Sequence, residues 1–426
     1  MKNCPAEYWI WLQSALGAGA RTDELLSYFG DPENMYSAGS NEWRLSGLLT
    51  PNKIEKLKRT SPSETKKIFD ECSKNGYKII TPSDSFFPER LRKLADMPLV
   101  LYVYGDSTVL CDELSLGMVG TRNASAYGTQ TAQKLSYSLA KAGFTLISGG
   151  ALGIDSEAHA GAMLAKGRTA AILGCGLSVK YLMENASLRR AIARHGCLVS
   201  EYQPMQPASK TTFPIRNRLI SGLTLGTVVI EAGKKSGSLI TADRALEQGK
   251  DLFAVPGDIV RSSFDGTNLL ISQGAKPVFS VADILGEYEY RYGELIDFSV
   301  CNERLADIEY VDFRNYKKNK NGQTGDVKKT PEANLQHNKI CQQKIEKDNF
   351  ANEIKAIKPT AKKEISGVSK EALAVYSVLT YEETHIDDIV RKSGLSMKEV
   401  LPALSELELE GVAEQFSGKH YALSSQ

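Results

Sequence analysis

The chain has 426 residues, more than a single hydrophobic core usually supports, so its length predicts two or three domains. Its composition, 42% hydrophobic and 24% charged, is typical of a globular protein. The formal net charge of +1 excludes a protein-wide basic field, so nucleic-acid binding would have to come from local clusters of Lys and Arg.

Residues 1–72 are predicted to form a small helical domain, similar to SAM or helix-hairpin-helix domains. The stretches "EYWIWLQSAL", "TDELLSYFG" and "NKIEKLKR" place apolar residues at three- and four-residue spacing, the period of amphipathic helices. Thr22 is a predicted N-cap and Gly30 a predicted helix stop. The segment "LSGLLTPNKIEKL" is similar to helix-hairpin-helix elements that contact DNA, although any small helical domain can contain such turns.

Residues 77–296 are predicted to form a Rossmann-like, doubly wound α/β domain with a mostly parallel sheet. Short β-rich runs such as "LSLGMVG", "FTLISGG", "TAAILGCG" and "GTVVIEA" end in small residues and alternate with helical stretches. Strands that are apolar on both faces, each followed by a helix, indicate a parallel sheet with helices on both sides.

Two further segments follow. Residues 299–366 are rich in Lys, Asn and Gln and poor in large apolar groups, which predicts a flexible polar linker. Residues 369–426 show helix, helix, Gly-containing turn, helix and two short strands, the order of a winged helix. Its would-be recognition helix carries Glu399, Glu406, Glu408 and Glu410 against Lys398, so a protein contact or an architectural role is favoured over duplex reading.

The loops that follow the strands are the expected ligand edge of the domain, because ligands bind beyond the carboxyl ends of strands in such sheets. Small residues there, including Gly149, Gly150 and the run Ser236, Gly237 and Ser238, free backbone N–H groups at helix starts. Helix N-termini attract phosphate, and a row of them suits a string of phosphates. The same glycines can also serve plain turn geometry.

Cationic side chains gather at this edge. Arg122 follows a strand, while Lys210, Arg216 and Arg218 surround the start of the helix in "FPIRNRLISGL". Phe213 could stack a base, or it could belong to the core while Arg216 pairs with Glu201 or Glu231. Glu231 could instead order the Ser236–Ser238 loop. Which of Arg216 and Arg218 contacts phosphate, and which pairs inward, stays open.

Two nucleotide motifs are missing from the expected places. No GxGxxG follows the first strand of the domain and no GxxxxGK[ST] is present, which argues against NAD and against a P-loop ATPase. An alternative is a nucleotide-processing enzyme of the phosphoribohydrolase type, with Asp155, Glu201 and Glu231 as acid–base groups. Such enzymes carry "PGGxGTxxE", which "VPGDIVRSSFDGTN" does not match.

The cellular setting is predicted from what the chain lacks. The N-terminal "MKNCPAEYWIW" has no signal-peptide pattern, and no apolar run reaches the length of a membrane span. The seven cysteines are scattered without a CxxC pair, which indicates reduced thiols and no zinc site. We therefore expect a cytoplasmic protein with no membrane segment and no metal.

An ordered set of motifs runs from about residue 117 to 275: "GTRNASAYG", "ISGGALGIDSEAH", "LGCGL", "SEY", "FPIRNRLISGL", "VVIEAGKKSGSLITADRALEQGKDLFAVPG" and "GTNLLISQGA". This set resembles the DprA/Smf family (DNA processing protein A), and the flanking helical and winged-helix segments are similar to that family's flanks. One departure is "GLSVKYLMEN", where the family often shows "GLDxxYPxxN"; Ser178 and Leu182 replace the acid and the proline. The long polar linker is not typical of the family.

The resemblance implies a non-enzymatic protein without a cofactor. Family members bind single-stranded DNA without sequence preference, protect it, help to load the RecA recombinase in natural transformation, and form homodimers through the Rossmann domain. Carried over motif by motif, the predicted DNA-binding residues are Arg122, Lys210, Phe213, Arg216, Asn217, Arg218, Gly149, Gly150, Ser236, Gly237 and Ser238.

Overall fold

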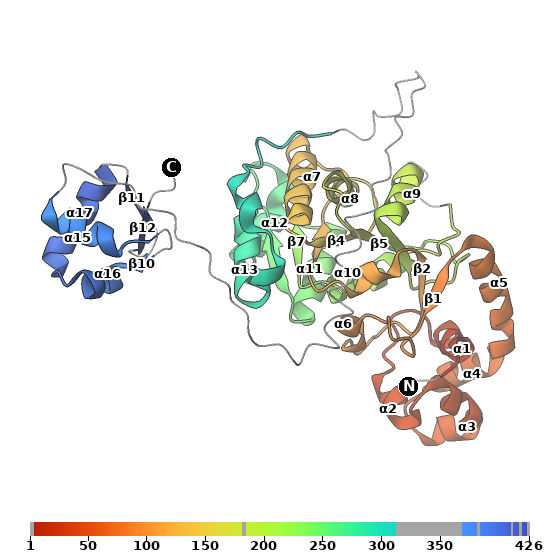
Figure 1. Ribbon diagram of the computed structural model, residues 1–426. Coiled ribbons are helices and arrows are strands. Elements are labelled where there is room, and N and C mark those ends of the chain that lie inside the picture. The colour runs from red at the N-terminus through yellow and green to blue at the C-terminus, as the bar shows by residue number, and fades with distance from the viewer. Residues whose placement is uncertain are drawn as a thin grey trace. The chain divides into compact units, whose positions relative to one another are not determined.

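A computed structural model describes residues 4–180, 185–311, 369–380, 384–409, 412–416 and 420–423 (Figure 1). The chain divides into two compact units, of which the first ends at Asn321. Residues 312–366 of the predicted linker lie outside the described residues, as do Leu182 and Glu410.

Helices make up the first part of the chain, as predicted. Asp31 and Thr50 cap two of them by accepting hydrogen bonds from Asn34 N and Lys53 N, and proline follows each cap at the first helical position. Thr22 and Gly30 flank a helix as expected, although the Thr22 side chain makes no capping hydrogen bond. The helices before the sheet are α1 (Ala6–Leu16), α2 (Asp23–Phe29), α3 (Pro32–Leu45), α4 (Pro51–Arg59) and α5 (Lys66–Asn75).

A single mostly parallel sheet forms the centre of the first unit. Within the described residues it has nine strands in the order β1-β2-β6-β5-β4-β3-β7-β8-β9. β1 and β2 are antiparallel to their neighbours, and the other pairings are parallel. The strands are β1 (Lys78–Ile80), β2 (Leu101–Gly105), β3 (Ser115–Val119), β4 (Thr145–Ser148), β5 (Thr169–Leu173), β6 (Gly196–Ser200), β7 (Gly226–Val229), β8 (Asp251–Ala254) and β9 (Lys276–Pro277).

Helices cover both faces of this sheet (Figure 1). Alternate strand residues point to opposite sides, so apolar strands present an apolar surface on each face. Leu116 and Met118 of β3 pack in one apolar cluster with α7, α8 and α13, whereas Val119 packs in another with α10, α11 and α12. This confirms the predicted doubly wound α/β fold. The helices between and after the strands are α6 (Glu89–Arg92), α7 (Ala126–Lys141), α8 (Ile154–Leu164), α9 (Ala186–His195), α10 (Thr212–Gly222), α11 (Gly237–Glu247), α12 (Asp265–Ser272) and α13 (Ala282–Tyr292).

The order of the strands reverses next to β3. From β3 the chain adds β4, β5 and β6 on one side, and then returns to add β7 and β8 on the other. The loops that leave β3 and β7 therefore run in opposite directions and open a crevice between them, which is where sheets of this kind bind ligands.

The N-terminal helices share an apolar cluster with one face of the sheet. Trp9 and Leu12 of α1 belong to the same cluster as Val199 of β6. The Gln13 side chain adds polar contacts: its Nε2 donates to the carbonyl of Glu201 at 2.5 Å, and its Oε1 accepts from Val100 N at 2.8 Å. The helical segment is thus packed on the sheet, and the boundary between residues 72 and 77 stays a prediction.

The first part of the predicted linker packs on the Rossmann-like unit. Val300 is buried, and Val311 exchanges hydrogen bonds with the Gln133 side chain of α7 at 2.8 and 2.9 Å. Residues 299–311 still contain apolar groups such as Val300 and Leu305, which explains why they pack before the polar composition sets in.

The second unit has the elements of a winged helix, as predicted. Its strands pair in the order β10-β12-β11, and its core contains Ile389, Leu404 and Tyr421. The elements are α15 (Lys370–Val378), β10 (Thr384–His385), α16 (Ile386–Ser393), α17 (Met397–Leu409), β11 (Ala413–Phe416) and β12 (His420–Leu423).

Two of the acidic residues on α17 have structural partners. Glu399 accepts hydrogen bonds from Ser396 N and Oγ, and Glu406 accepts from Ser369 N and Oγ, which lowers the pKa of both carboxyls. A protein-contact or architectural role for this unit stays a prediction. Among the residues described, no helix is both long and apolar enough to cross a bilayer.

A buried ion pair joins α10 to the end of β6. Arg218 Nη2 lies 2.7 Å from Glu201 Oε1, and each side chain is only 2% exposed. Arg218 Nε also lies 3.2 Å from Asp96 Oδ2, and Gly19 N donates to Glu201 Oε1 at 3.3 Å. Three separated segments and α10 therefore meet at one arginine.

Glu201→Ala should destabilise the full chain by about 3 kcal/mol, because it leaves the buried Arg218 guanidinium with a single, partly exposed partner. Urea unfolding measures this change. The matched control is Glu247→Ala, which removes the exposed pair with Arg244 and should cost no more than about 0.5 kcal/mol. Equal costs for the two variants would contradict a structural role for the buried pair.

Candidate nucleic-acid interface

A cleft of about 320 Å³ opens where the strand order reverses, at the carboxyl edge of the sheet. Its walls come from the loop after β3, the first turns of α8 and α10, and the start of α11. The predicted site residues among its lining are Arg122, Phe213, Arg216, Asn217, Ser236, Gly237 and Ser238.

Glu231, just after β7, holds the loop that carries Arg122. Its Oε2 accepts hydrogen bonds from Ser125 N at 2.9 Å and from Ser125 Oγ at 2.8 Å. The Ser125 hydroxyl in turn caps α7 by accepting from Gly128 N. The expectation that Glu231 pairs with Arg216 or orders the Ser236–Ser238 loop is therefore wrong, since its carboxylate binds Ser125. The loop is anchored while the Arg122 side chain remains exposed.

Close approach between the loop and its neighbours requires glycine at two positions. A Cβ at Gly128 would lie 2.0 Å from Glu231 Oε2, and a Cβ at Gly153 would lie 2.4 Å from the carbonyl oxygen of Thr121. Gly153 also has a φ of 75°, which side chains with a Cβ rarely adopt. These contacts hold the start of α7 against Glu231 and the start of α8 against the loop after β3.

Arg216 points inward and lies at the base of the cleft. It is 5% exposed, and its Nη1 donates to the carbonyls of Gly149 and Ile172, at the ends of β4 and β5. Burial lowers the pKa of its guanidinium, while nearby Asp155 opposes that shift. Its Nε has no hydrogen-bond partner among the described residues. A phosphate contact by Arg216 stays a prediction.

Phe213 is half-buried and lies beside both cleft arginines. The guanidinium carbons of Arg122 and Arg216 lie 5.3 and 5.9 Å from the centroid of its ring, within the range of cation–π contacts. The ring also packs on Gly174, where a Cβ would lie 2.6 Å from Phe213 Cδ1. The ring is thus held in a defined position at the wall of the cleft; its packing agrees in part with the core interpretation, and base stacking stays a prediction.

The division of labour between the two neighbouring arginines is clear for Arg218. Its proposed contact with DNA needs correction, because the side chain is buried and paired with Glu201 and Asp96. Asn217, between the arginines, donates from Nδ2 to the carbonyl of Gly237 at 3.3 Å and so ties α10 to the start of α11.

The remaining predicted residues fall into two groups. Ser236 and Ser238 shape the start of α11, since Ser236 Oγ accepts from Ser238 N. Lys210, Gly149 and Gly150 do not line the cleft: Lys210 is exposed just before α10, and the glycines form the turn after β4. Lys210 can extend a basic surface beyond the cleft but does not shape it.

Asp155 lines the cleft, whereas the sequence suggests a role for it only as an acid–base group of a nucleotide-processing enzyme. It is buried in the first turn of α8, and burial raises the pKa of its carboxyl against the opposing effect of Arg216. An acid in a first helical turn is common, so its residue type gave no signal.

His159 on the same helix contacts Thr169 Oγ1 through Nδ1, and burial lowers its pKa to about 3, so it is neutral at physiological pH. No cluster of three potential metal ligands occurs in the described part of the chain.

Gly128→Ala should cost about 1–3 kcal/mol of stability, because the new methyl group collides with Glu231 and displaces it from Ser125. The free energy of urea unfolding measures the effect. Gly286→Ala is the matched control: its Cβ meets nothing within 4 Å inside α13, so it should stabilise the chain by about 0.5–1 kcal/mol. A neutral Gly128→Ala variant would show that Glu231 does not hold the loop as described.

Comparisons with known proteins identify the family to which this chain belongs. Residues 78–289 match the family described as DNA recombination-mediator protein A, and residues 359–419 match the DprA winged helix domain. DNA processing protein DprA of Bacillus subtilis is 40% identical over 248 residues, which are 58% of this chain and 82% of the relative. Protein Smf of Synechocystis is 29% identical over 430 residues, 99% of each chain. The X-ray structure of DprA from Streptococcus pneumoniae aligns with a TM-score of 0.59 and 32% identity over 67% of this chain and 99% of that one. The chain therefore belongs to the DNA recombination-mediator protein A family, also named DprA/Smf.

Proposed function

We propose that this chain binds single-stranded DNA without sequence preference at the cleft between β3 and β7. The observation that carries the proposal is the position of Phe213 between two arginines, one exposed and one buried, at the edge of the sheet where helices begin. This arrangement offers a stacking face and positive charge to one nucleotide at a time, with no base-specific donor pattern.

The physics of the cleft favours an unpaired strand. Stacking of a base on an aromatic ring contributes about 1–3 kcal/mol and tolerates any base. It requires a base face that is not already covered by base-pair neighbours, as in single strands. The starts of α7, α8, α10 and α11 face the same edge, so their N-terminal dipole ends favour the phosphates.

The proposed role is binding and not catalysis. The strand-end acids named for a nucleotide-processing enzyme are engaged in structural contacts: Glu201 pairs with Arg218, and Glu231 holds Ser125. Asp155 lies beside Arg216 and balances its buried charge. We assign these acids to positioning the cleft, with no cofactor.

We further propose that the protein acts on cytoplasmic single-stranded DNA as a homodimer and hands the strand to RecA, as the resemblance to the family implies. Ile259 and Val260, each 87% exposed, and Phe279, 75% exposed, are large apolar side chains of the Rossmann-like unit, and we assign them to the proposed contact between the two copies.

Arg122→Ala should weaken binding to all single-stranded sequences alike and should make the log–log salt slope shallower by about 0.7, the contribution of one neutralised phosphate. If all four cations predicted from the sequence neutralised a phosphate, the slope would be about −3. Because Arg218 pairs inward and Arg216 is buried, Arg122 and Lys210 alone give about −1.4. Fluorescence anisotropy of labelled dT and mixed-sequence oligonucleotides between low and moderate salt measures both quantities.

The matched control is Arg194→Ala, which removes an exposed charge from the last turn of α9, outside the lining of the cleft. It should leave affinity and slope unchanged. Equal binding of duplex and single strands by the wild-type chain, or a slope insensitive to Arg122, would overturn the proposal.

RecA loading has its own test. The full chain should accelerate RecA filament formation on single-stranded DNA that is precoated with a single-strand binding protein, and Arg122→Ala should lose most of this acceleration because it no longer holds the strand. DNA-dependent ATP hydrolysis by RecA reports the rate. If wild-type chain binds DNA but leaves the RecA lag unchanged, the loading role fails while the DNA-binding role stands.

A further inference from the structure

A second pocket, of about 770 Å³, lies at the opposite edge of the sheet from the cleft. Among its lining residues, Leu225 directly precedes β7 and Lys250 directly precedes β8, so the pocket sits at the amino ends of these strands. Positive side chains from four separated parts of the chain line it, namely Arg21, Arg90, Lys93, Arg244, Lys250 and Arg291.

Both acids that line this pocket have ion-pair partners. Asp96 pairs with the buried Arg218, and Glu247 pairs at 2.6 Å with Arg244 of the pocket itself, so that pair adds no net charge. No carboxylate of the described residues lies within 4 Å of the charged groups of Lys93, Lys250 or Arg291. The pocket therefore holds an excess of positive charge that the described residues do not neutralise.

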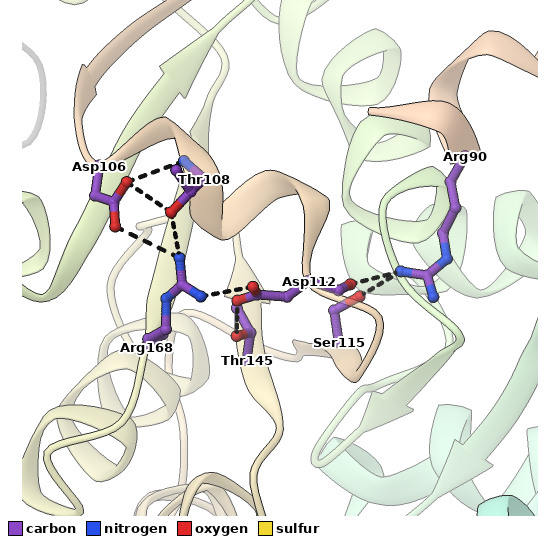
Figure 2. Close-up of polar contacts among 7 residues, drawn as sticks. All are labelled: Arg90, Asp106, Thr108, Asp112, Ser115, Thr145 and Arg168. Carbon is purple, nitrogen blue, oxygen red and sulfur yellow. Dashed lines mark hydrogen bonds and ion pairs between the residues drawn. The ribbon is translucent and has the colours of Figure 1, made fainter. Parts of the chain in front are cut away.

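Arg90 is fixed in place by neutral acceptors. Its Nη1 donates to the carbonyl of Asp112 at 2.9 Å and to Ser115 Oγ at 3.0 Å, and its Nη2 donates to the carbonyl of Glu113 at 2.6 Å. Figure 2 shows that the carboxylate of Asp112 is turned instead to Arg168, whose Nη1 lies 2.6 Å from it. The guanidinium of Arg90 is thus held without an acidic partner, and its charge adds to the potential of the pocket.

Lys250 experiences this potential most directly. It is half-buried, and burial lowers the pKa of its ammonium group, with Arg90 and then Lys93 lowering it further; Arg291 adds to the same effect and Asp251 opposes it. Cations brought together without counter-charges repel one another and cost stability. An anion between them would remove that cost, which is the electrostatic pattern of an anion-binding site.

We infer that this pocket is a second anion site, which binds closely spaced phosphate groups through Lys93, Lys250 and Arg291. The volume admits a chain of several phosphates, and the charges come from different directions, which suits a polyphosphate or a phosphodiester backbone more than one isolated ion. Helix α11 connects the two sites: Ser238 near its start lines the cleft and Glu247 at its end lines the pocket. Its 11 residues span about 16 Å. The inference does not depend on the proposed function.

Calorimetric titration of the full chain with inorganic tripolyphosphate tests the site directly. The wild-type chain should bind with saturable 1:1 stoichiometry, and Lys250→Gln combined with Arg291→Gln should weaken binding by at least tenfold. Lys93→Gln, an exposed single change with little consequence for folding, should weaken it by several-fold. Arg122→Ala, in the cleft, and the charge-matched control Lys58→Gln with Lys74→Gln should leave the titration unchanged.

The source of the phosphates is separated by a second arm that uses long oligo-dT. If the pocket takes a DNA backbone, the double variant also lowers the salt slope of dT binding; if it takes a free nucleotide, the slope is unchanged and ATP competes with tripolyphosphate. Binding of tripolyphosphate that is lost in Arg122→Ala but kept in the double variant would overturn the inference, as would the absence of saturable binding. Loss of DNA binding in Arg122→Ala alone bears on the proposed function and leaves this site intact.

Discussion

The reversal of strand order beside β3 is the constraint on which the arrangement of both sites depends. Since β7 returns to the other side of β3 from β4, the loops leaving the two strands separate, and no helix can cover the gap at their carboxyl ends. The crossover that leads back carries α10, so Phe213 lies at the wall of that gap and Arg216 at its base. The same crossover ends at Leu225, at the rim of the basic pocket on the opposite edge.

Charge is treated in two different ways within a few residues of α10. Arg218 is neutralised inside the protein by Glu201 and Asp96, and it connects the sheet to the N-terminal segment. Arg216 is also buried, but its Nη1 is held by backbone carbonyl groups, and Asp155 in the lining of the same cleft opposes its charge. Helix geometry explains the difference. Two residues along a helix correspond to a rotation of about 200° around its axis, so the two side chains point to nearly opposite sides. One arginine is therefore held by acids at the junction with the N-terminal segment, and the other is held by backbone carbonyls at the base of the cleft.

Much of the fold could be predicted from the sequence because its signals are local and repeated. The alternation of apolar strands and helices indicates the doubly wound sheet, and the row of small residues after the strands indicates its ligand edge. The side-chain partners could not be predicted in the same way. Glu231 holds Ser125, which is 106 positions away in the chain, and several acids could have filled that role. The spacing of Arg216 and Arg218 predicts that they point to different sides of α10 but not that both are buried, and the packing of residues 299–311 depends on a tertiary contact with Gln133.

The amino-edge pocket left no trace in the sequence, because its cations are scattered between Arg21 and Arg291 and meet only in the folded chain. The small net charge of the protein, +1, conceals this local excess. A surface that looks unremarkable in composition can thus carry two separate positive regions at opposite edges of one sheet.

The central claim, that single-stranded DNA lies in the cleft between β3 and β7, is tested most directly by photo-crosslinking. Ultraviolet irradiation of the full chain with a bromouridine-substituted oligonucleotide, followed by mass spectrometry, identifies the residues that stack on bases. The account predicts a dominant cross-link at Phe213 that disappears in Phe213→Leu. Cross-links confined to the winged-helix residues 369–409, with none in the loops of the cleft, would contradict it.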